Sequence, residues 1–229
     1  MPADPNSAIW VVLAAYNEAT VIGRVVSDLV RHDYAVLAVD DGSHDATGQK
    51  AQAAGATVIT HPVNLGQGAA LQTGIRYALK HGAEYIVTFD ADGQHHASDV
   101  ETLVASLKAH RVDFALGSRF RGQALAMPWA RRKVLQLATW FTRFTTGLQV
   151  TDTHNGLRAM TRCGAARIAL RQNRMAHATE FLDQIARSRL GYVEVPVTIE
   201  YSAYSLAKGQ KLSDSLRILV DLSAQRLHR

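Results

Sequence analysis

The chain has almost no cysteine, since Cys163 is the single one among 229 residues. One thiol excludes an internal disulfide framework and is typical of a protein of the reducing cytoplasm. Long hydrophobic runs are missing too, because the longest, from Ala8 to Tyr16, is far shorter than the about 20 residues that a membrane-spanning helix needs. Residues 1–7 contain no basic residue and so lack the opening of a signal peptide. We expect a cytoplasmic protein that is soluble or acts at the inner face of the membrane.

The rest of the composition is that of an ordinary globular domain. Hydrophobic residues make up 47% and charged residues 20% of the chain, which is long enough to bury a sizeable core. Because no repeat, low-complexity segment or linker interrupts it, we expect one domain over residues 1–229. The formal net charge of +5, together with ten histidines, favours an anionic partner such as a nucleotide, a phosphate, an acidic membrane or nucleic acid.

Segments typical of strands and of helices alternate along the chain. The expected strands are residues 9–15, 35–39, 57–60, 85–89 and 114–117, and the expected helices are 19–31, a segment capped by Asp45 or Thr47 and ending near 54, 69–81 and 98–110. This order predicts right-handed βαβ units and an open, mostly parallel sheet flanked by helices. Further on, we expect a helix over 181–190, an edge strand over 193–200 because of Pro196, and an amphipathic helix over 212–227.

Polar side chains follow each predicted strand of the first half. They are Asn17 and Glu18, Asp40 and Asp41, Asn64, Asp90 and Asp92, and Ser118 and Arg119. The carboxyl ends of parallel strands share one edge of a sheet, so the sequence predicts a single ligand cleft there. Asp90 and Asp92 repel each other, and a divalent cation between them and a second anion, such as a diphosphate, would relieve that repulsion. A solvated turn is the alternative interpretation of these two residues.

Several familiar ligand motifs are absent. Gly66-Gln67-Gly68 lacks the third glycine of a dinucleotide fingerprint, and the segment 42–50 lacks the Gly-Lys-Ser/Thr of a P-loop. A calcium loop starting at Asp90 fails because His95 stands where glycine is required. No Cys/His spacing supports zinc at His95-His96, which we interpret as a solvated turn, and Cys163 is expected to be a small buried residue.

One stretch has no negative charge at all. Between Phe114 and Thr151 there is no acidic residue, while arginines and a lysine alternate with tryptophans and phenylalanines. This pattern suits a phosphate carried on an apolar molecule or an anionic bilayer surface. Nucleic-acid binding and a core-facing helix with a basic flank are the alternatives. The C-terminal amphipathic helix has three possible sites of docking: a membrane, a second copy of the chain, or its own domain.

Six motifs together resemble the family 2 glycosyltransferases of the GT-A fold, and within that family the dolichyl- or polyprenyl-phosphate mannose synthase-like branch. They are residues 14–18 (AAYNE), 39–43 (VDDGS), 64–68 (NLGQG), 89–95 (FDADGQH), 117–120 (GSRF) and 152–156 (DTHNG). The resemblance covers residues 9 to about 160 in the family's order. It implies a Rossmann-like α/β domain in which 9–117 binds a nucleotide sugar and 118–229 binds the acceptor and carries the C-terminal helix. Ala14, Gln67 and His154-Asn155 depart from the residues usual in these motifs.

The resemblance also implies roles for individual residues. The donor site would contain Ala15, Tyr16, Glu18, Asp40, Gln67, Asp90 and Ala91, and Mg²⁺ or Mn²⁺ would be held by Asp90, Asp92 and Gln94. The acceptor phosphate would be held by Arg119, Arg132, Lys208 and Lys211, and the catalytic residues would be Asp92, Arg119 and Asp152.

The activity implied is metal-dependent, inverting transfer of a hexose from a GDP- or UDP-sugar to polyprenyl or dolichyl phosphate. An alternative acceptor is a saccharide hydroxyl in cell-surface polysaccharide synthesis, which needs a general base such as Asp152, Glu180 or Asp183. A nucleotidyltransferase is disfavoured because no lysine-anchored, glycine-rich triphosphate loop lies near the N-terminus. A nucleic-acid-binding module is disfavoured because it leaves the polar strand ends unexplained. We expect no nucleic-acid partner, and a homo-oligomer is conceivable through the C-terminal helix.

Overall fold

The computed structural model of the chain describes residues 8–172, 176–201 and 204. The elements in chain order are β1 (Ile9–Ala15), α1 (Ile22–Val30), β2 (Ala35–Asp40), α2 (Thr47–Ala53), β3 (Thr57–Thr60), α3 (Gln67–Lys80), β4 (Tyr85–Asp90), α4 (Ser98–His110), β5 (Phe114–Leu125), α5 (Trp129–Thr146), β6 (Arg158–Thr161), α6 (Arg162–Ala166), α7 (Ala176–Ser188) and β7 (Tyr192–Glu200). No described helix has the length and apolar character needed to span a membrane.

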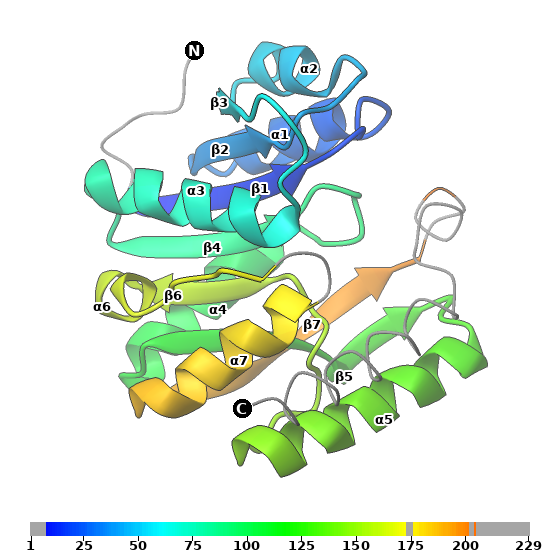
Figure 1. Cartoon of the computed structure of the whole chain (residues 1–229), viewed down its shortest axis with the longest axis vertical. Coiled ribbons are helices and arrows are strands. Elements are labelled where there is room, and N and C mark those ends of the chain that lie inside the picture. Colours follow the sequence, from blue (N-terminus) through cyan, green and yellow to red (C-terminus); the bar gives the residue numbers. More distant parts are fainter. Residues whose placement is uncertain (1–7, 173–175, 202–203, 205–229) are drawn as a thin grey trace.

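The described strands form one mixed sheet in the order β3-β2-β1-β4-β6-β5-β7 (Figure 1). β1 pairs in parallel with β2 and β4, β2 with β3, and β5 with β7. β6 is antiparallel to both β4 and β5, so every strand except β6 points the same way. The predicted mostly parallel sheet is confirmed, and strands from both predicted halves of the chain share it.

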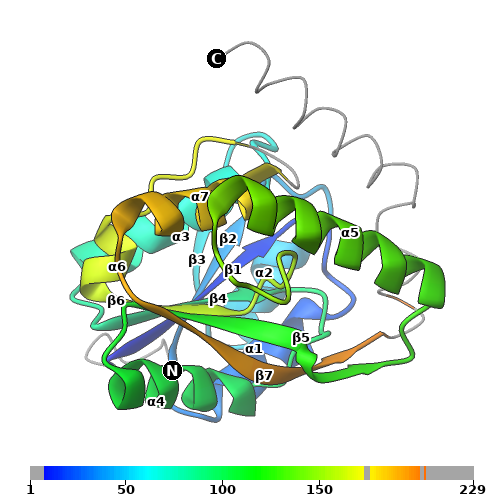
Figure 2. The same ribbon diagram turned by 90° about the horizontal axis from the view of Figure 1, so that it is seen from below.

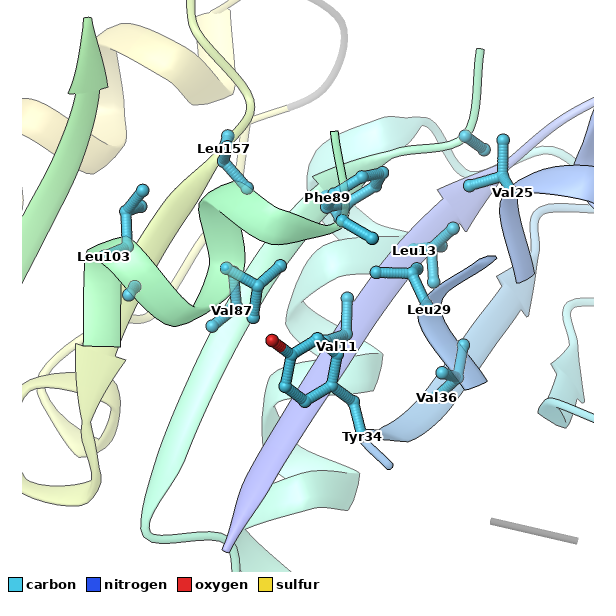
Figure 3. Close-up of a cluster of buried hydrophobic side chains, with 14 of the residues drawn as sticks. Val11, Leu13, Val25, Leu29, Tyr34, Val36, Val87, Phe89, Leu103 and Leu157 are labelled. Carbon is cyan, nitrogen blue, oxygen red and sulfur yellow. The ribbon is translucent and has the colours of Figure 1, made fainter. Parts of the chain in front are cut away.

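Helices cover both faces of this sheet (Figure 2). In β1, Val11 and Leu13 belong to the cluster under α1 and α4 (Figure 3), while Val12 belongs to the cluster under α3 and α7. Successive strand residues point to opposite faces, so a strand covered on both faces must be apolar throughout. α1 contributes Ile22, Val25, Val26 and Leu29, which recur at the spacing of one helix face.

Several elements differ from the sequence-based expectations. β5 extends to Leu125, because β7 continues to pair with it beyond a register shift between Ser118 and Gln123. β6 was not expected, since a strand of four residues gives no periodic signal. β7 lies at the sheet edge, as Pro196 predicts. The predicted helix over 212–227 lies outside the described residues.

Cys163 is exposed, and the expectation that it is buried was wrong. It lies in the short helix α6, whose buried positions are instead Gly164 and Ala165. A small side chain is often buried, but a short helix packs only one side against the core, and Cys163 lies on the other side.

Candidate active site

A cleft of about 420 Å³ opens at the carboxyl ends of the parallel strands. The predicted site residues that line it are Ala15, Tyr16, Glu18, Gln67, Asp90, Ala91, Asp92, Gln94 and Arg119. Asp41 and Asn64, from two other polar strand ends, line it as well. Asp40, Arg132 and Asp152 do not line the cleft, and Lys208 and Lys211 lie outside the described residues.

Tyr16 and Glu18 form one end of the cleft, just beyond β1. Tyr16 is 37% exposed, and its ring meets His44 edge-on, with 6.4 Å between ring centroids. The backbone N–H of Glu18 donates to Thr47 Oγ1 (2.7 Å), and its carboxylate accepts from the Tyr204 hydroxyl (2.8 Å). An exposed aromatic ring can stack on a base, and the carboxylate beside it can accept a hydrogen bond from a ribose hydroxyl.

Asp40 and Asp41 have different surroundings although they are adjacent. Asp40 Oδ1 accepts from the Ser43 N–H (3.0 Å), behind the wall of the cleft. Asp41 accepts from the N–H groups of Leu65 (3.0 Å) and Gly66 (2.7 Å) and contacts His61 Nδ1 at 2.8 Å. Asp41 therefore fixes the loop that brings Asn64 and Gln67 to the cleft, a role that the sequence did not reveal.

Asp90 is held at the centre of the cleft by two side chains. Gln67 Nε2 donates to its Oδ1 (3.2 Å), and His95 Nε2 contacts its Oδ2 at 3.0 Å. Burial acts to raise the Asp90 pKa, but the hydrogen bond and charge of His95 and the charge of Arg158 outweigh it, so the pKa lies below its ordinary value. The His95 side chain is only 2% exposed and its ring packs on Phe89, so the interpretation of His95 as a solvated turn residue was wrong.

Asp92 is the second carboxylate of the pair. Burial and the negative charge of Asp90 raise its pKa to about 6. Its Oδ1 accepts from the Gln94 N–H (3.1 Å), and its Oδ2 has no hydrogen-bond partner within the part of the chain that the structure describes. Two like charges are thus kept close together at an accessible position.

The donor set fits a hard divalent cation that is shared with a ligand. Among the described residues, no three His, Cys, Asp or Glu side chains gather closely enough to hold a metal ion by themselves. Asp90, Asp92 and Gln94 offer oxygen donors, and Mg²⁺ typically binds through one or two carboxylates plus substrate phosphates. The residues therefore suit a metal whose coordination is completed by a diphosphate.

Arg119 and Asp152, both predicted to be catalytic, form a buried ion pair at the opposite end of the cleft. Arg119 donates through Nε to Asp152 Oδ2 (2.6 Å), through Nη1 to the Tyr201 hydroxyl (2.6 Å) and through Nη2 to the His154 carbonyl (2.7 Å). Burial acts to lower the Arg119 pKa, but the charge of Asp152 outweighs it and the pKa is raised. Asp152 also accepts from the N–H groups of Arg119 and His154. The hydrogen bonds of both side chains are therefore made within the protein, where they stabilise the fold.

The other base candidates also lie away from the cleft. The carboxylate of Glu180 accepts from the N–H groups of Arg171 and Gln172 and so fixes the segment before α7. Asp183 pairs with Arg187 on the same helix, with 2.8 Å between Oδ2 and Nη2. Neither lines the cleft.

Four titratable residues of the cleft were not assigned to the site from the sequence: Arg131, His154, Arg158 and His177. Arg131 lies over the Tyr201 ring, 5.1 Å from its centroid. Arg158 is buried over Phe181 (4.5 Å) and donates to the Asn155 carbonyl (2.9 Å), and burial lowers its pKa to about 10 despite the charges of Asp90 and Asp152. The basic stretch held a signal for Arg131, whereas Arg158 depends on the unexpected strand β6.

Residues 10–172 match the model of glycosyl transferase family 2. An uncharacterised protein of Methanocaldococcus jannaschii is 36% identical over 224 residues, which cover 96% of this chain and 92% of that protein. The UDP-N-acetylglucosamine–dolichyl-phosphate N-acetylglucosaminyltransferase of Methanococcus voltae is 31% identical over 240 residues, which cover 95% of each chain.

The fold is also that of a solved enzyme structure. Glucosyl-3-phosphoglycerate synthase from Mycobacterium tuberculosis, in complex with Mn²⁺ and UDP-glucose, superposes with a TM-score of 0.73 at 20% identity, covering 97% of this chain and 80% of that one. At this identity the likeness shows the fold, and the predicted α/β architecture is confirmed. Because the family match extends over most of the described sheet and the sequence relatives span nearly the whole chain, the protein belongs to glycosyltransferase family 2.

Proposed function

We propose that this glycosyltransferase moves a hexose, with inversion, from a UDP- or GDP-sugar to a polyprenyl or dolichyl phosphate. The observation that carries the proposal is that a carboxylate pair and three arginines share one cleft. We call the part beyond β1 and β4, with Glu18 and Asp92, the carboxylate end, and the part beside β5 and α5, with Arg119 and Arg131, the arginine end; Arg158, on β6 between them, interacts with the charge of Asp90. The Methanococcus voltae relative, whose name states a UDP-sugar and dolichyl phosphate, is consistent with this assignment.

The carboxylate end would bind the donor. Tyr16 and Glu18 would hold the nucleoside, and Ala15, Gln67 and Ala91 would line the same pocket, with Asp40 stabilising its wall from behind. A Mg²⁺ or Mn²⁺ ion held by Asp90, Asp92 and Gln94 would offset the negative charge of the departing nucleoside diphosphate. Gln67 and His95 keep Asp90 oriented for this task, because each contacts one of its two oxygens.

The arginine end would bind the acceptor phosphate. A phosphate oxygen forms the new bond to the anomeric carbon while the bond from that carbon to the diphosphate breaks, and the electron pair leaves with the diphosphate. The attacking oxygen is already ionised near neutral pH, so no proton has to be removed. Arg131 and Arg158 would orient it with charge-assisted hydrogen bonds, and Arg119 would position Tyr201 and the 152–154 segment.

A hydroxyl acceptor would need a base that the carboxylates of the cleft do not supply. Glu18 accepts from Tyr204, Asp41 from the 65–66 backbone, and Asp90 from Gln67, while Asp92 is assigned to the metal. In the saccharide alternative we assign that role to His177, a titratable residue of the cleft. The absence of a spare carboxylate in the described cleft favours the phosphate acceptor.

We also propose that the protein works at the inner face of a membrane and contacts it through α5. Trp129, Trp140 and Phe144 are 77%, 64% and 80% exposed on this helix. Exposed aromatic side chains beside basic residues suit the interface of an anionic bilayer.

The proposal is tested with purified protein, a panel of UDP- and GDP-sugars, and polyprenyl phosphate in detergent. We expect labelled sugar in the lipid fraction with one donor, with Mg²⁺ or Mn²⁺ present and not after chelation, and an inverted anomer by NMR. Polyprenol without phosphate is the control acceptor and should receive no sugar. Transfer to a saccharide but not to the lipid phosphate, lost in His177→Gln, would establish the alternative instead.

A further inference from the structure

A second hollow, of about 430 Å³, lies beside α5 and outside the transfer cleft. Its walls include Arg132, Gln136, Thr139, Trp140 and Arg143, none of which lines the cleft. Apart from the adjacent Thr139 and Trp140, these positions follow one another by three or four residues, which places them along one side of the helix. Phe120 of β5 and Thr151 complete the lining, so the hollow lies between α5 and the segments beside it, and we call it the α5 hollow.

Two guanidinium groups give the α5 hollow its charge. Arg143 is half-buried and donates through Nε to the Val150 carbonyl (2.5 Å), which fixes it against the loop after the helix. Arg132 is exposed, and its side chain has no hydrogen-bond or ion-pair partner among residues 8–172, 176–201 and 204. None of the residues that line the hollow is acidic, and the carboxylate bonded to one of them, Glu194 on Thr151, is buried and already paired with Arg121. Guanidinium groups suit phosphate oxygens in particular.

The rim of the α5 hollow is apolar and exposed. Trp140 stacks with Phe144 at 6.0 Å between centroids and 12° between planes. Leu137 is 53% exposed on the same helix, and of its 18 residues only Ala138, Thr139 and Thr142 are buried. An exposed apolar surface of this kind on a soluble domain marks an interaction site. Figure 2 shows α5 at the outer side of the helical layer, with α7 next to it.

We propose that the α5 hollow binds the phosphate of an anionic phospholipid headgroup while its aromatic rim enters the bilayer interface. The two guanidinium groups require an anionic partner. The exposed side chains of Trp140, Phe144 and Leu137 require an apolar surface beside it. Nucleic acid satisfies the first condition, and its bases can stack on Trp140 and Phe144, but it leaves the exposed aliphatic side chain of Leu137 without an apolar partner, which a bilayer supplies. The occupant is bulk membrane lipid and not the acceptor, since the α5 hollow lies outside the cleft. This inference deepens the proposed membrane contact and is independent of which acceptor receives the sugar.

The test is co-sedimentation of the full chain with vesicles that contain no polyprenyl phosphate. One set is phosphatidylcholine alone, and the other is phosphatidylcholine mixed with phosphatidylglycerol. We expect binding to the mixed vesicles and at least tenfold weaker binding to phosphatidylcholine alone, because each basic residue at an anionic surface contributes about 1 kcal/mol.

The decisive variant is the double substitution Arg132→Gln/Arg143→Gln. It should weaken binding to the mixed vesicles by about 30-fold or more, as two such contributions predict. The matched control is Arg76→Gln/Lys133→Gln, which removes the same charge from exposed positions on α3 and α5 outside the hollow. We expect the control to weaken vesicle binding by about fivefold or less, because only Lys133, on α5, would lie near the membrane surface.

The outcomes separate the possibilities. Equal losses in the two double variants would mean diffuse charge attraction and would overturn the headgroup site. No binding by the unchanged protein, or equal binding to both vesicle types, would also overturn it, as would salt-sensitive binding of RNA or DNA in place of vesicles. Circular dichroism should show both double variants folded at the assay temperature, with the melting temperature lowered by a few degrees at most in Arg132→Gln/Arg143→Gln, which loses the hydrogen bond to the Val150 carbonyl. Since neither vesicle contains a sugar acceptor, the result does not depend on the transfer assay.

Discussion

Arg119 Nε lies 2.6 Å from Asp152 Oδ2, and both side chains are almost completely buried at the arginine end of the cleft. Removing one partner of a buried ion pair leaves the other charge without compensation. We expect Asp152→Asn and Arg119→Gln each to lower the free energy of unfolding by about 3–5 kcal/mol, measured by denaturant titration.

The control for that prediction is a pair on the protein surface. Arg31 and Asp28 are 2.6 Å apart on 72% and 46% exposed side chains. Arg31→Gln should cost less than about 1 kcal/mol. An Asp152→Asn variant with unchanged stability and no transfer activity would instead assign Asp152 a direct role in the reaction.

The Asp92 carboxylate belongs to the pair at the centre of the cleft, and its Oδ2 accepts no hydrogen bond from the described residues. Asp92→Ala should abolish nucleotide binding that depends on metal and lower kcat/KM by about 1000-fold or more, because charge stabilisation at the leaving group is lost. A thermal-shift titration of UDP and GDP with and without Mn²⁺ measures the binding, and denaturant titration checks the fold. Asp28→Asn, on the exposed face of α1, serves as the control. Normal activity in Asp92→Ala would contradict the whole assignment of the site.

The backbone architecture and the location of the cleft follow from the sequence more directly than the roles of its side chains. The continuous apolar run of β1 must be covered on both faces, and the polar residues after the parallel strands must share an edge. That reasoning brings Glu18, Asp90 and Arg119 to one cleft, as the structure does.

The role of a side chain depends on how its helix or strand is oriented toward the cleft, and sequence spacing alone does not determine that orientation. Arg131 and Arg132 are neighbours in one basic run, yet only Arg131 lines the cleft, because the rotation of α5 is set by its packing. Arg158 reaches the same cleft through β6, whose pairing is set by β4 and β5. His95 follows a strand end like a solvated turn residue, but its ring is buried against Phe89 by tertiary packing.

His154 makes the stability of the protein depend on pH. Burial lowers its pKa to about 4 from the ordinary value of 6.5, so the native protein keeps it neutral where the unfolded chain protonates it. Its contribution to stability is therefore complete above the unfolded pKa and is lost as the pH falls toward the folded pKa. Between about pH 8 and about pH 5 the loss should be about 2 kcal/mol.

The measurement is the free energy of unfolding of the unchanged protein and of His154→Gln across this range. Glutamine does not titrate, so the difference between the two proteins isolates His154 from other groups, including Asp92. The difference should change by about 2 kcal/mol, with the unchanged protein losing more as the pH falls. Parallel pH curves would show that His154 is accessible to protons in the native state.

Substitutions of Arg131 and of its neighbours on α5 test which of these residues bind the acceptor and which contact the membrane. Arg131→Gln should raise the KM for polyprenyl phosphate in detergent by about 10- to 100-fold, because a hydrogen bond to a charged group contributes about 1.5–3 kcal/mol. The donor KM should stay within about twofold, since Arg131 lies over the Tyr201 ring, which Arg119 also holds, and the donor is assigned to the residues that follow β1 and β4. Lys133→Gln, two residues along the helix and outside both the cleft and the α5 hollow, is the control and should leave both constants unchanged. A larger effect of Arg132→Gln than of Arg131→Gln on the acceptor KM would return Arg132 to the acceptor site and contradict the geometry of the cleft.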